Sequence, residues 1–199
     1  MTATVLLIRH AAHVDLNRRL SGRRQGVSLS EAGRAQADVL GRHLARRDIT
    51  RVECSPLERT WDTAAIIAQR CGLSAPVATD ALIEVDFGDW TGRAFDSFAE
   101  DPQWDAWNVR RGSATVPGGE SMATAQGRIV DHLQAVAAAA GGETIAMVSH
   151  ADMIRAAVAH VLGLPLDHLL RFDIDPASVT AVRIEDWGAR LLSLNEKGQ

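Results

Sequence analysis

The sequence predicts an α/β fold: a three-layer α/β/α sandwich with a mostly parallel central sheet and a small helical cap insertion. Three observations support this prediction. Short apolar runs alternate along the chain with segments of helical periodicity, as in layered α/β proteins. Two of these runs end abruptly at a histidine, which is typical of strands that are buried on both faces. A segment rich in aromatic residues, glycine and proline interrupts the alternation between about residues 80 and 120, and we expect it to form the cap over one end of the sheet.

Length and composition narrow the class of protein. A chain of 199 residues fits one domain, which we expect to cover residues 1–199. Lysine and arginine number 21 and aspartate and glutamate 25, a net charge of −4 that excludes a generally basic nucleic-acid binder. Two cysteines without a C-x-x-C pair exclude a disulfide framework. No window approaches the ~18 apolar residues of a membrane span, and the first apolar run is too short for a signal peptide. We therefore expect a cytoplasmic protein that binds neither nucleic acid nor membrane.

The first half of the chain predicts three strands and two helices. The strands are expected at Val5–Ile8, Arg51–Cys54 and Ala75–Thr79. The arginine-rich stretch of residues 9–29 is expected to be a loop, and loops of this length are usually functional. Ser30 opens the first helix, whose apolar spacing is carried by Ala32, Ala35, Val39, Leu40 and Leu44. The second helix is expected to begin at a capping box, Ser55–Glu58, with proline at its first position, and to stop at Gly72.

The second half follows the same alternation after the cap segment. A long helix is expected from Met122 to Ala140, closed by two glycines, then a strand at Thr144–Ser149 and a helix at Ala151–Leu162. A terminal hairpin of Ser178–Glu185 and Arg190–Asn195 completes the chain. The edge of this hairpin is either the surface of a homodimer or has no role in assembly.

Positively charged and histidine side chains follow three of the predicted strands. The first strand is followed by Arg9 and His10, the second by Arg59 in the helix after it, and the fourth by His150. In open α/β sheets, ligands bind outside the carboxyl ends of the strands. The planar guanidinium group of arginine can donate two parallel hydrogen bonds to phosphate oxygens. The helix expected to begin at Ala151 adds free backbone N–H groups that can bind an anion. The sequence therefore predicts a pocket for a phosphoryl group.

Histidine beside each arginine indicates chemistry beyond phosphate binding. A neutral imidazole can accept a phosphoryl group and release it to water, and neighbouring arginines disfavour the imidazolium form of His10. They also neutralise the oxygens of the transferring group. The leaving alkoxide needs a proton, and Glu84, in the loop after the third strand, is the candidate donor. Cations lower the pKa of such a carboxyl group, whereas a bound phosphate dianion opposes that effect.

Five motifs, in order along most of the chain, resemble the histidine phosphatase superfamily of phosphoglycerate-mutase-like proteins. They are Arg9–Ala11, Ser55–Thr60, Leu82–Gly92, Pro117–Ser121 and Val148–Ala151. This resemblance implies that His10 is the phosphorylated nucleophile and Glu84 the proton donor. It also implies, as phosphate ligands, Arg9, Asn17, Arg59, His150 and Ala151. It implies no metal and no other cofactor.

The sequence departs from the family pattern at three positions. Ala11 and Ala151 stand where the family has glycine, which matters if either position needs a positive φ or a close backbone approach. Ala12 stands where many members have glutamate, which leaves Glu84 as the main acid.

Several further residues have two interpretations. Trp90 and its aromatic neighbours either stack on the organic part of a substrate or form the core of the cap. The basic loop that contains Arg23 and Arg24 either binds a second anionic group or is a solvated charged surface. Glu120 is expected to cap the long helix. His10 and His13 have a spacing found in metal sites, but no further ligand accompanies them.

The sequence thus favours a metal-independent phosphomonoesterase acting on a small phosphorylated metabolite. A mutase that passes the phosphoryl group to a second hydroxyl is the nearest alternative, although the chain lacks the longer insertion and tail of glycolytic mutases. A non-catalytic module that binds phosphorylated ligands and a protein-phosphohistidine phosphatase are the others. The identity of the phosphate ester stays open.

Overall fold

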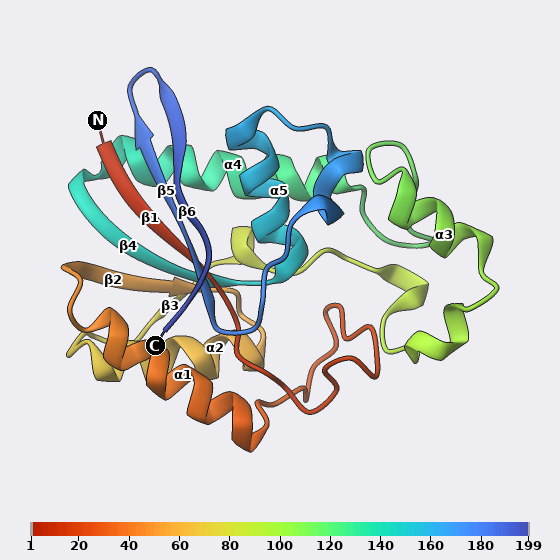
Figure 1. Ribbon diagram of the computed structural model, residues 1–199, viewed down its shortest axis with the longest axis horizontal. Coiled ribbons are helices and arrows are strands. Elements are labelled where there is room, and N and C mark those ends of the chain that lie inside the picture. The colour runs from red at the N-terminus through yellow and green to blue at the C-terminus, as the bar shows by residue number, and fades with distance from the viewer. Residues whose placement is uncertain (1, 199) are drawn as a thin grey trace.

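The computed structural model describes residues 2–198 and contains one six-stranded sheet with helices on both faces (Figure 1). The strands lie in the order β3-β2-β4-β1-β5-β6, and their bounds are β1 Thr2–Arg9, β2 Ile49–Cys54, β3 Val77–Ala78, β4 Gly141–Ser149, β5 Ser178–Glu185 and β6 Gly188–Lys197. The first four strands in this order are parallel, and β5 and β6 form an antiparallel hairpin against β1. The predicted mostly parallel sheet is therefore confirmed.

Five α-helices cover the sheet and its ends. Their bounds are α1 Glu31–Leu44, α2 Glu58–Arg70, α3 Pro102–Val109, α4 Met122–Ala139 and α5 Ala151–Leu162. Shorter 3₁₀ turns lie at Asp80–Leu82, Gly88–Trp90, Phe95–Phe98 and Leu166–Arg171. The last of these turns was not expected from the sequence, and β3 is shorter than the predicted strand at Ala75–Thr79.

The side chains of β1 alternate between two cores, which is why the fold has three layers. Leu6 and Ile8 pack in the core that contains residues of α1 and α2, whereas Val5 and Leu7 pack in the core that contains residues of α4 and α5. Successive residues of a strand point to opposite faces of the sheet, and here both faces are covered. Figure 1 shows the two helix pairs on opposite sides of the strands, which confirms the predicted sandwich.

The buried face of α1 differs from the predicted one. Val39 is 45% exposed, and Ala32 and Ala35 are exposed as well, whereas the buried residues include two glycines, Gly33 and Gly41. A Cβ atom at Gly33 would lie 1.8 Å from the carbonyl oxygen of Ala12, so only glycine lets the helix approach the loop after β1 this closely. The close approach of the helix backbone to the loop after β1 determines which face of α1 is buried. The spacing of apolar residues in the sequence does not reveal this contact.

The start of α2 is also corrected. The helix begins at Glu58 with Leu57 at its N-cap and no side-chain cap, so Ser55 and Pro56 lie before it rather than in it. The carboxylate of Glu58 accepts a hydrogen bond from the backbone N–H of Val27 instead of closing a capping box. The hydroxyl of Ser55 still accepts from the backbone N–H of Leu57 at 3.4 Å, just before the helix begins. Ser121, not Glu120, caps α4 through the N–H of Thr124.

The segment expected to be a cap contains three of the 3₁₀ turns and α3. Its aromatic side chains pack on each other: the ring centroid of Trp90 lies 5.4 Å from that of Trp104, 6.0 Å from Phe98 and 6.2 Å from Trp107. The segment contacts the loop after β1, because the N–H of Leu20 donates to the carbonyl oxygen of Arg93. Figure 1 shows both on the same side of the sheet, and the role of a cap stays a prediction.

Candidate active site

The ends of neighbouring parallel strands bring the two predicted histidines together. Arg9, the last residue of β1, pairs in register with Ser149, the last residue of β4. The residues that follow are His10 and His150, and the N–H of His10 donates to the carbonyl oxygen of Ser149 at 3.0 Å. Their imidazole centroids lie 5.3 Å apart. Two histidines 140 positions apart in the sequence are thus adjacent in space because β1 and β4 are neighbouring strands.

The guanidinium group of Arg59 lies between the two imidazoles. Arg59 is only 1% exposed and is the second residue of α2. Its Nε donates to Nε2 of His10 at 3.3 Å, and its Nη2 lies 3.2 Å from Nδ1 of His150 and 2.7 Å from the carbonyl oxygen of Gly22. Arg9 approaches from β1, with Nη1 bonded to the carbonyl oxygen of Ile174 at 2.6 Å.

Two buried N–H groups of these arginines have no partner. Nη1 of Arg59 and Nε of Arg9 are inaccessible to solvent and make no hydrogen bond to any atom of the described chain. An unsatisfied buried donor costs roughly 1–3 kcal/mol, and more for a charged group. Oxygens of a bound phosphate are charged acceptors of the kind that such donors require. This pair of unpaired donors is the feature of the site that most directly indicates an anionic ligand.

The hydrogen bonds of His10 fix its reactive nitrogen. Nδ1 lies 2.8 Å from the carbonyl oxygen of Ala11. A carbonyl only accepts, so Nδ1 carries the proton and the lone pair of the neutral ring is on Nε2. Burial, followed by the charges of Arg59 and Arg9, lowers the pKa of His10 well below its usual range. The ring is therefore neutral near pH 7, with the nucleophilic nitrogen on the side of Arg59.

His150 has the opposite tautomer. Nδ1 accepts from Arg59, so Nε2 carries the proton and donates to Oγ of Ser55 at 2.9 Å. Burial and the charge of Arg59 lower the pKa of His150 as well. Ser55, which was expected to cap a helix, instead orients this imidazole from the end of β2.

Glu84 lies at the same site as a carboxyl group with a raised pKa. Its Oε2 is 3.7 Å from Nδ1 of His150, and its Oε1 accepts from the N–H of Val85 at 3.0 Å. Burial, with the nearby charge of Asp152, raises the pKa of Glu84 to about 7, against the opposing effects of Arg59, the Val85 N–H and Arg9. A carboxyl group with this pKa is substantially protonated at neutral pH and can donate a proton.

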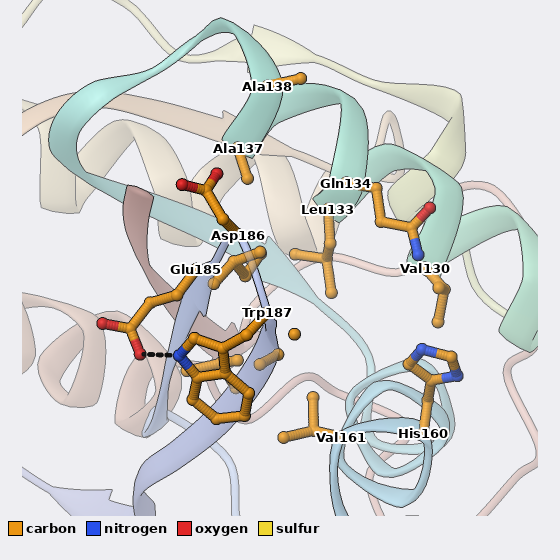
Figure 2. Close-up of a pocket in the computed structure, with 14 residues that line it drawn as sticks. Val130, Leu133, Gln134, Ala137, Ala138, His160, Val161, Glu185, Asp186 and Trp187 are labelled. Atoms are coloured by element: carbon orange, nitrogen blue, oxygen red, sulfur yellow. Dashed lines mark hydrogen bonds between the residues drawn. The ribbon is translucent and has the colours of Figure 1, made fainter. Parts of the chain in front are cut away.

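Four of these residues, Arg9, His10, Arg59 and Glu84, line a cavity of about 120 Å³, whereas His150 is fully buried behind this lining. Its lining residues are Arg9, His10, His13, Leu16, Asn17, Arg19, Leu20, Ser21, Gly22, Arg59, Glu84, Phe95 and Ala151. A larger cavity of about 410 Å³ lies between α4, α5 and the β5–β6 hairpin (Figure 2). That cavity is lined mainly by aliphatic side chains and the Trp187 indole, and neither site histidine faces it. The chemistry is thus concentrated in the smaller cavity.

Asn17 and Ala151 line the cavity as the sequence predicted. Asn17 has a φ of 59°, in the left-handed region that asparagine tolerates better than most residues. Ala151 is the first residue of α5, so its backbone N–H is one of the free amides of that helix. Neither Ala11 nor Ala151 has a positive φ, so a methyl group at these positions adds no backbone strain.

Three predicted substrate contacts do not reach the cavity. Trp90 is 1% exposed and packs in the aromatic cluster of the cap segment. Burial there removes more of its apolar surface from water than a position at the open cavity would. Arg24 pairs with Asp15 at 3.1 Å on the surface. The guanidinium of Arg23 is engaged by Glu120 at 2.7 Å and by the backbone of the Glu84 loop. None of the three residues lines the cavity, and their suggested contacts with substrate stay a prediction.

The structure places three further residues in the cavity lining that were not among the predicted site residues. His13 and Ser21 lie in the long loop after β1, and Phe95 comes from the cap segment. The ring centroid of His13 is 5.2 Å from that of His10, and Oγ of Ser21 is buried without a partner. Burial, followed by the charge of Arg59, lowers the pKa of His13 to about 4. Ser21 had no sequence signal beyond its place in a polar loop of unusual length. His13 was noted only for its spacing from His10, and Phe95 only as one of the aromatic neighbours of Trp90.

Two features are absent from residues 2–198. No helix in this range is long and apolar enough to cross a membrane. No group of three or more histidine, cysteine, aspartate or glutamate side chains is arranged to hold a metal ion there.

Comparison with known proteins agrees with this geometry. The chain is 32% identical over 196 residues to phosphoserine phosphatase 1 of Hydrogenobacter thermophilus, an alignment that covers 96% of this chain and 91% of the relative. It is 30% identical over 185 residues to a probable phosphoglycerate mutase GpmB of Yersinia pestis (strain Pestoides F), covering 92% and 85%. The solved structure of Bacillus stearothermophilus YhfR superposes with a TM-score of 0.90 at 26% identity, over 98% of this chain and 97% of that one. The model of the histidine phosphatase superfamily (branch 1) matches residues 5–197, and the chain belongs to that superfamily.

Proposed function

We propose that this protein hydrolyses small phosphate monoesters through a phosphohistidine formed on Nε2 of His10. The observation that carries this proposal is the pair of unsatisfied buried donors, Nε of Arg9 and Nη1 of Arg59, on two arginines that line the same cavity as His10. A phosphoryl group bound to both donors would be held at the lone pair of a neutral imidazole. Catalysis of phosphoryl transfer depends mainly on such positioning and charge neutralisation.

In the first step, the lone pair of Nε2 attacks phosphorus. A nitrogen–phosphorus bond forms, the bond from phosphorus to the ester oxygen breaks, and that oxygen takes the proton of Glu84 and leaves as an alcohol. In the second step, a water molecule attacks phosphorus and gives a proton to the Glu84 carboxylate, and inorganic phosphate leaves Nε2. The raised pKa of Glu84 supports both roles, since the group is close to half protonated at neutral pH.

The remaining phosphate contacts are assigned to residues around the cavity. Arg9 and Arg59 neutralise the phosphoryl oxygens. His150, whose ring lies beside that of His10, would bind one of these oxygens through Nδ1 once that nitrogen takes up a proton as the phosphate dianion binds. Asn17 and the N–H of Ala151 complete the ligand set, supported by their places in the lining of the cavity. None of these contacts calls for a metal ion.

The substrate class is supported by the charge of the cavity mouth. Arg19 lines the cavity and gives one guanidinium N–H to the carbonyl oxygen of Gly92 at 3.1 Å, which leaves its other N–H groups available to a second anionic group. Phosphoserine and phosphoglycerate, the substrates in the names of two relatives, both carry a carboxylate near the phosphate. Phosphorylated carboxylic acids are therefore the first metabolites to test.

The mutase activity named for one relative is the alternative. It uses the same phosphoenzyme but returns the phosphoryl group to a second hydroxyl group rather than to water. The cellular setting we propose is the cytoplasm, consistent with free Cys54 and Cys71. The edge strand β6 is the surface we expect in a homodimer.

The experiment is a panel of phosphate esters incubated with purified protein in EDTA. We expect release of inorganic phosphate, and a loss of more than ~10³-fold in His10→Ala because the covalent route is removed. Turnover that survives this substitution would refute the nucleophile. Transfer to an added diol or hydroxy acid in preference to water would identify a mutase, and tight binding of phosphate esters without turnover would identify a binding module.

A further inference from the structure

The loop that carries Glu84 is held by two arginines through its backbone. Nε of Arg23 donates to the carbonyl oxygen of Glu84 at 2.8 Å, and Nη1 of Arg128, from α4, donates to that of Ile83 at 2.9 Å. A second nitrogen of each arginine donates to the same atom, Oε1 of Glu120, at 2.7 and 2.8 Å. Oε1 of Glu120 thus links the two arginines that bind the consecutive carbonyl groups of Ile83 and Glu84.

Glu120 also holds the loop on the other side of the acid. Its Oε1 accepts from the N–H of Asp86 at 2.8 Å, and its own N–H donates to the carbonyl oxygen of Asp86 at 3.0 Å. The Glu120 side chain is 15% exposed, so solvent competes little for these bonds. The three donors that converge on this oxygen are charge-assisted, the stronger kind of hydrogen bond.

The backbone packs so tightly here that side chains are excluded at two points. A Cβ atom at Gly88 would lie 2.2 Å from the carbonyl oxygen of Pro117, and one at Gly119 would lie 2.2 Å from that of Asp86. The turn that carries Glu120 is thereby pressed against the loop that carries Glu84. This contact determines where the Glu120 carboxylate lies.

The side chain of Glu84 has little fixing it directly. Within residues 2–198 its carboxylate accepts one hydrogen bond, from the adjacent Val85 N–H, and Nδ1 of His150 is 3.7 Å away. Its position in the cavity therefore depends on the peptide groups on either side. A displacement of about 1 Å in a catalytic geometry can cost on the order of 10²-fold in rate.

We propose that Glu120 is a positioning residue that holds Glu84 at the leaving-group oxygen through Arg23, Arg128 and the Asp86 amide. This inference rests on the proposed function, in which Glu84 is the proton donor. Glu120 does not contact the substrate, and it was expected from sequence only to cap a helix. The loss of rate on substituting Glu120 should therefore be larger for a substrate whose leaving group needs the proton of Glu84.

The test is a double-mutant cycle with Glu120→Gln and Glu84→Gln, measured on two esters. Phosphoserine has a poor leaving group that needs the proton, whereas p-nitrophenyl phosphate does not. We expect Glu120→Gln to lower kcat for phosphoserine by roughly 10- to 100-fold and that for p-nitrophenyl phosphate by less than about threefold. In the Glu84→Gln background the same substitution should change kcat by less than about twofold, because it acts through the missing acid.

Two further measurements keep the test decisive. Hydrogen exchange at the Asp86 amide should accelerate in Glu120→Gln, whatever the activity. If Glu120→Gln does not fold, Arg23→Lys takes its place in the test, because this substitution leaves the contacts of Glu120 with Arg128 and Asp86 in place. A matched control is Glu53→Gln, which removes a buried carboxylate bonded to Arg51 and His132 away from the cavity and should slow both esters equally or not at all.

Equal slowing of the two esters by Glu120→Gln, or an undiminished effect in the Glu84→Gln background, would overturn the positioning role while leaving the phosphatase intact. A wild-type protein that hydrolyses neither ester would overturn the proposed function, and this inference with it.

Discussion

Loss of the proton from Glu84 should slow the hydrolysis of alkyl phosphates as the pH rises through neutrality. Burial and the charge of Asp152 raise the pKa of Glu84 to about 7. For one group with this pKa, the protonated fraction falls from about 0.9 at pH 6 to about 0.1 at pH 8, a roughly tenfold change. A general acid is active only in its protonated form, so its contribution should fall by that factor.

The assay compares two esters at each pH, because the phosphate group of any substrate also titrates near neutrality. We expect the ratio of kcat/KM for phosphoserine to that for p-nitrophenyl phosphate to fall about tenfold between pH 6 and pH 8. The value of kcat/KM reports the free enzyme, for which the pKa of Glu84 applies. In Glu84→Gln the ratio should be low and flat over the same range.

A ratio that stays constant from pH 6 to pH 8 in the wild type would refute the assignment of Glu84 as the acid. So would a pH-dependent ratio that persists in Glu84→Gln. A profile of the same shape whose midpoint is displaced from pH 7 by more than about 2 pH units would show that burial and Asp152 do not set the pKa of Glu84.

Three other predictions concern different parts of the molecule. Arg59→Lys removes the fork between the two imidazoles and should lower kcat/KM by roughly 10²-fold or more, whereas Arg24→Lys, outside the cavity, should leave it within about twofold. His13 has a folded-state pKa of about 4 and an unfolded value near 6.5, so it stabilises the fold above pH 6.5. That contribution, up to about 3 kcal/mol, should be lost as the pH falls from 6.5 to 4, and urea unfolding of His13→Gln should show a shallower loss. Trp90→Ala should cost about 3–5 kcal/mol in urea unfolding while KM for p-nitrophenyl phosphate stays within about twofold, since Trp90 lies outside the cavity.

The presence of both histidines at one edge of the sheet could be predicted, because both follow buried strands. Apolar runs that end at His10 and His150 identify strands buried on both faces, and parallel strands present their carboxyl ends at one edge. The structure makes β1 and β4 neighbours in register, which is the arrangement that brings the two rings together. Such a prediction needs no side-chain geometry.

What the sequence could not predict depends on close contacts and on competition between partners. Ser55 has the pattern of a helix cap, but an imidazole that needs an acceptor for Nε2–H takes its hydroxyl instead. Arg23 is a basic loop residue like Arg24, and only the tertiary fold places a carboxylate, Glu120, against one and not the other. The buried face of α1 is marked by Gly33, whose contribution is the absence of a side chain.

The central claim is that Nε2 of His10 takes the phosphoryl group, and the direct measurement is the phosphoenzyme itself. Protein mixed rapidly with a labelled phosphate ester, quenched in alkali and digested should yield one labelled peptide, containing His10. Because Nδ1 is protonated and bonded to the carbonyl oxygen of Ala11, the phosphorus should be found on Nε2 by NMR of that peptide. Label on Nδ1, on another residue or on no residue at all during turnover would contradict the account.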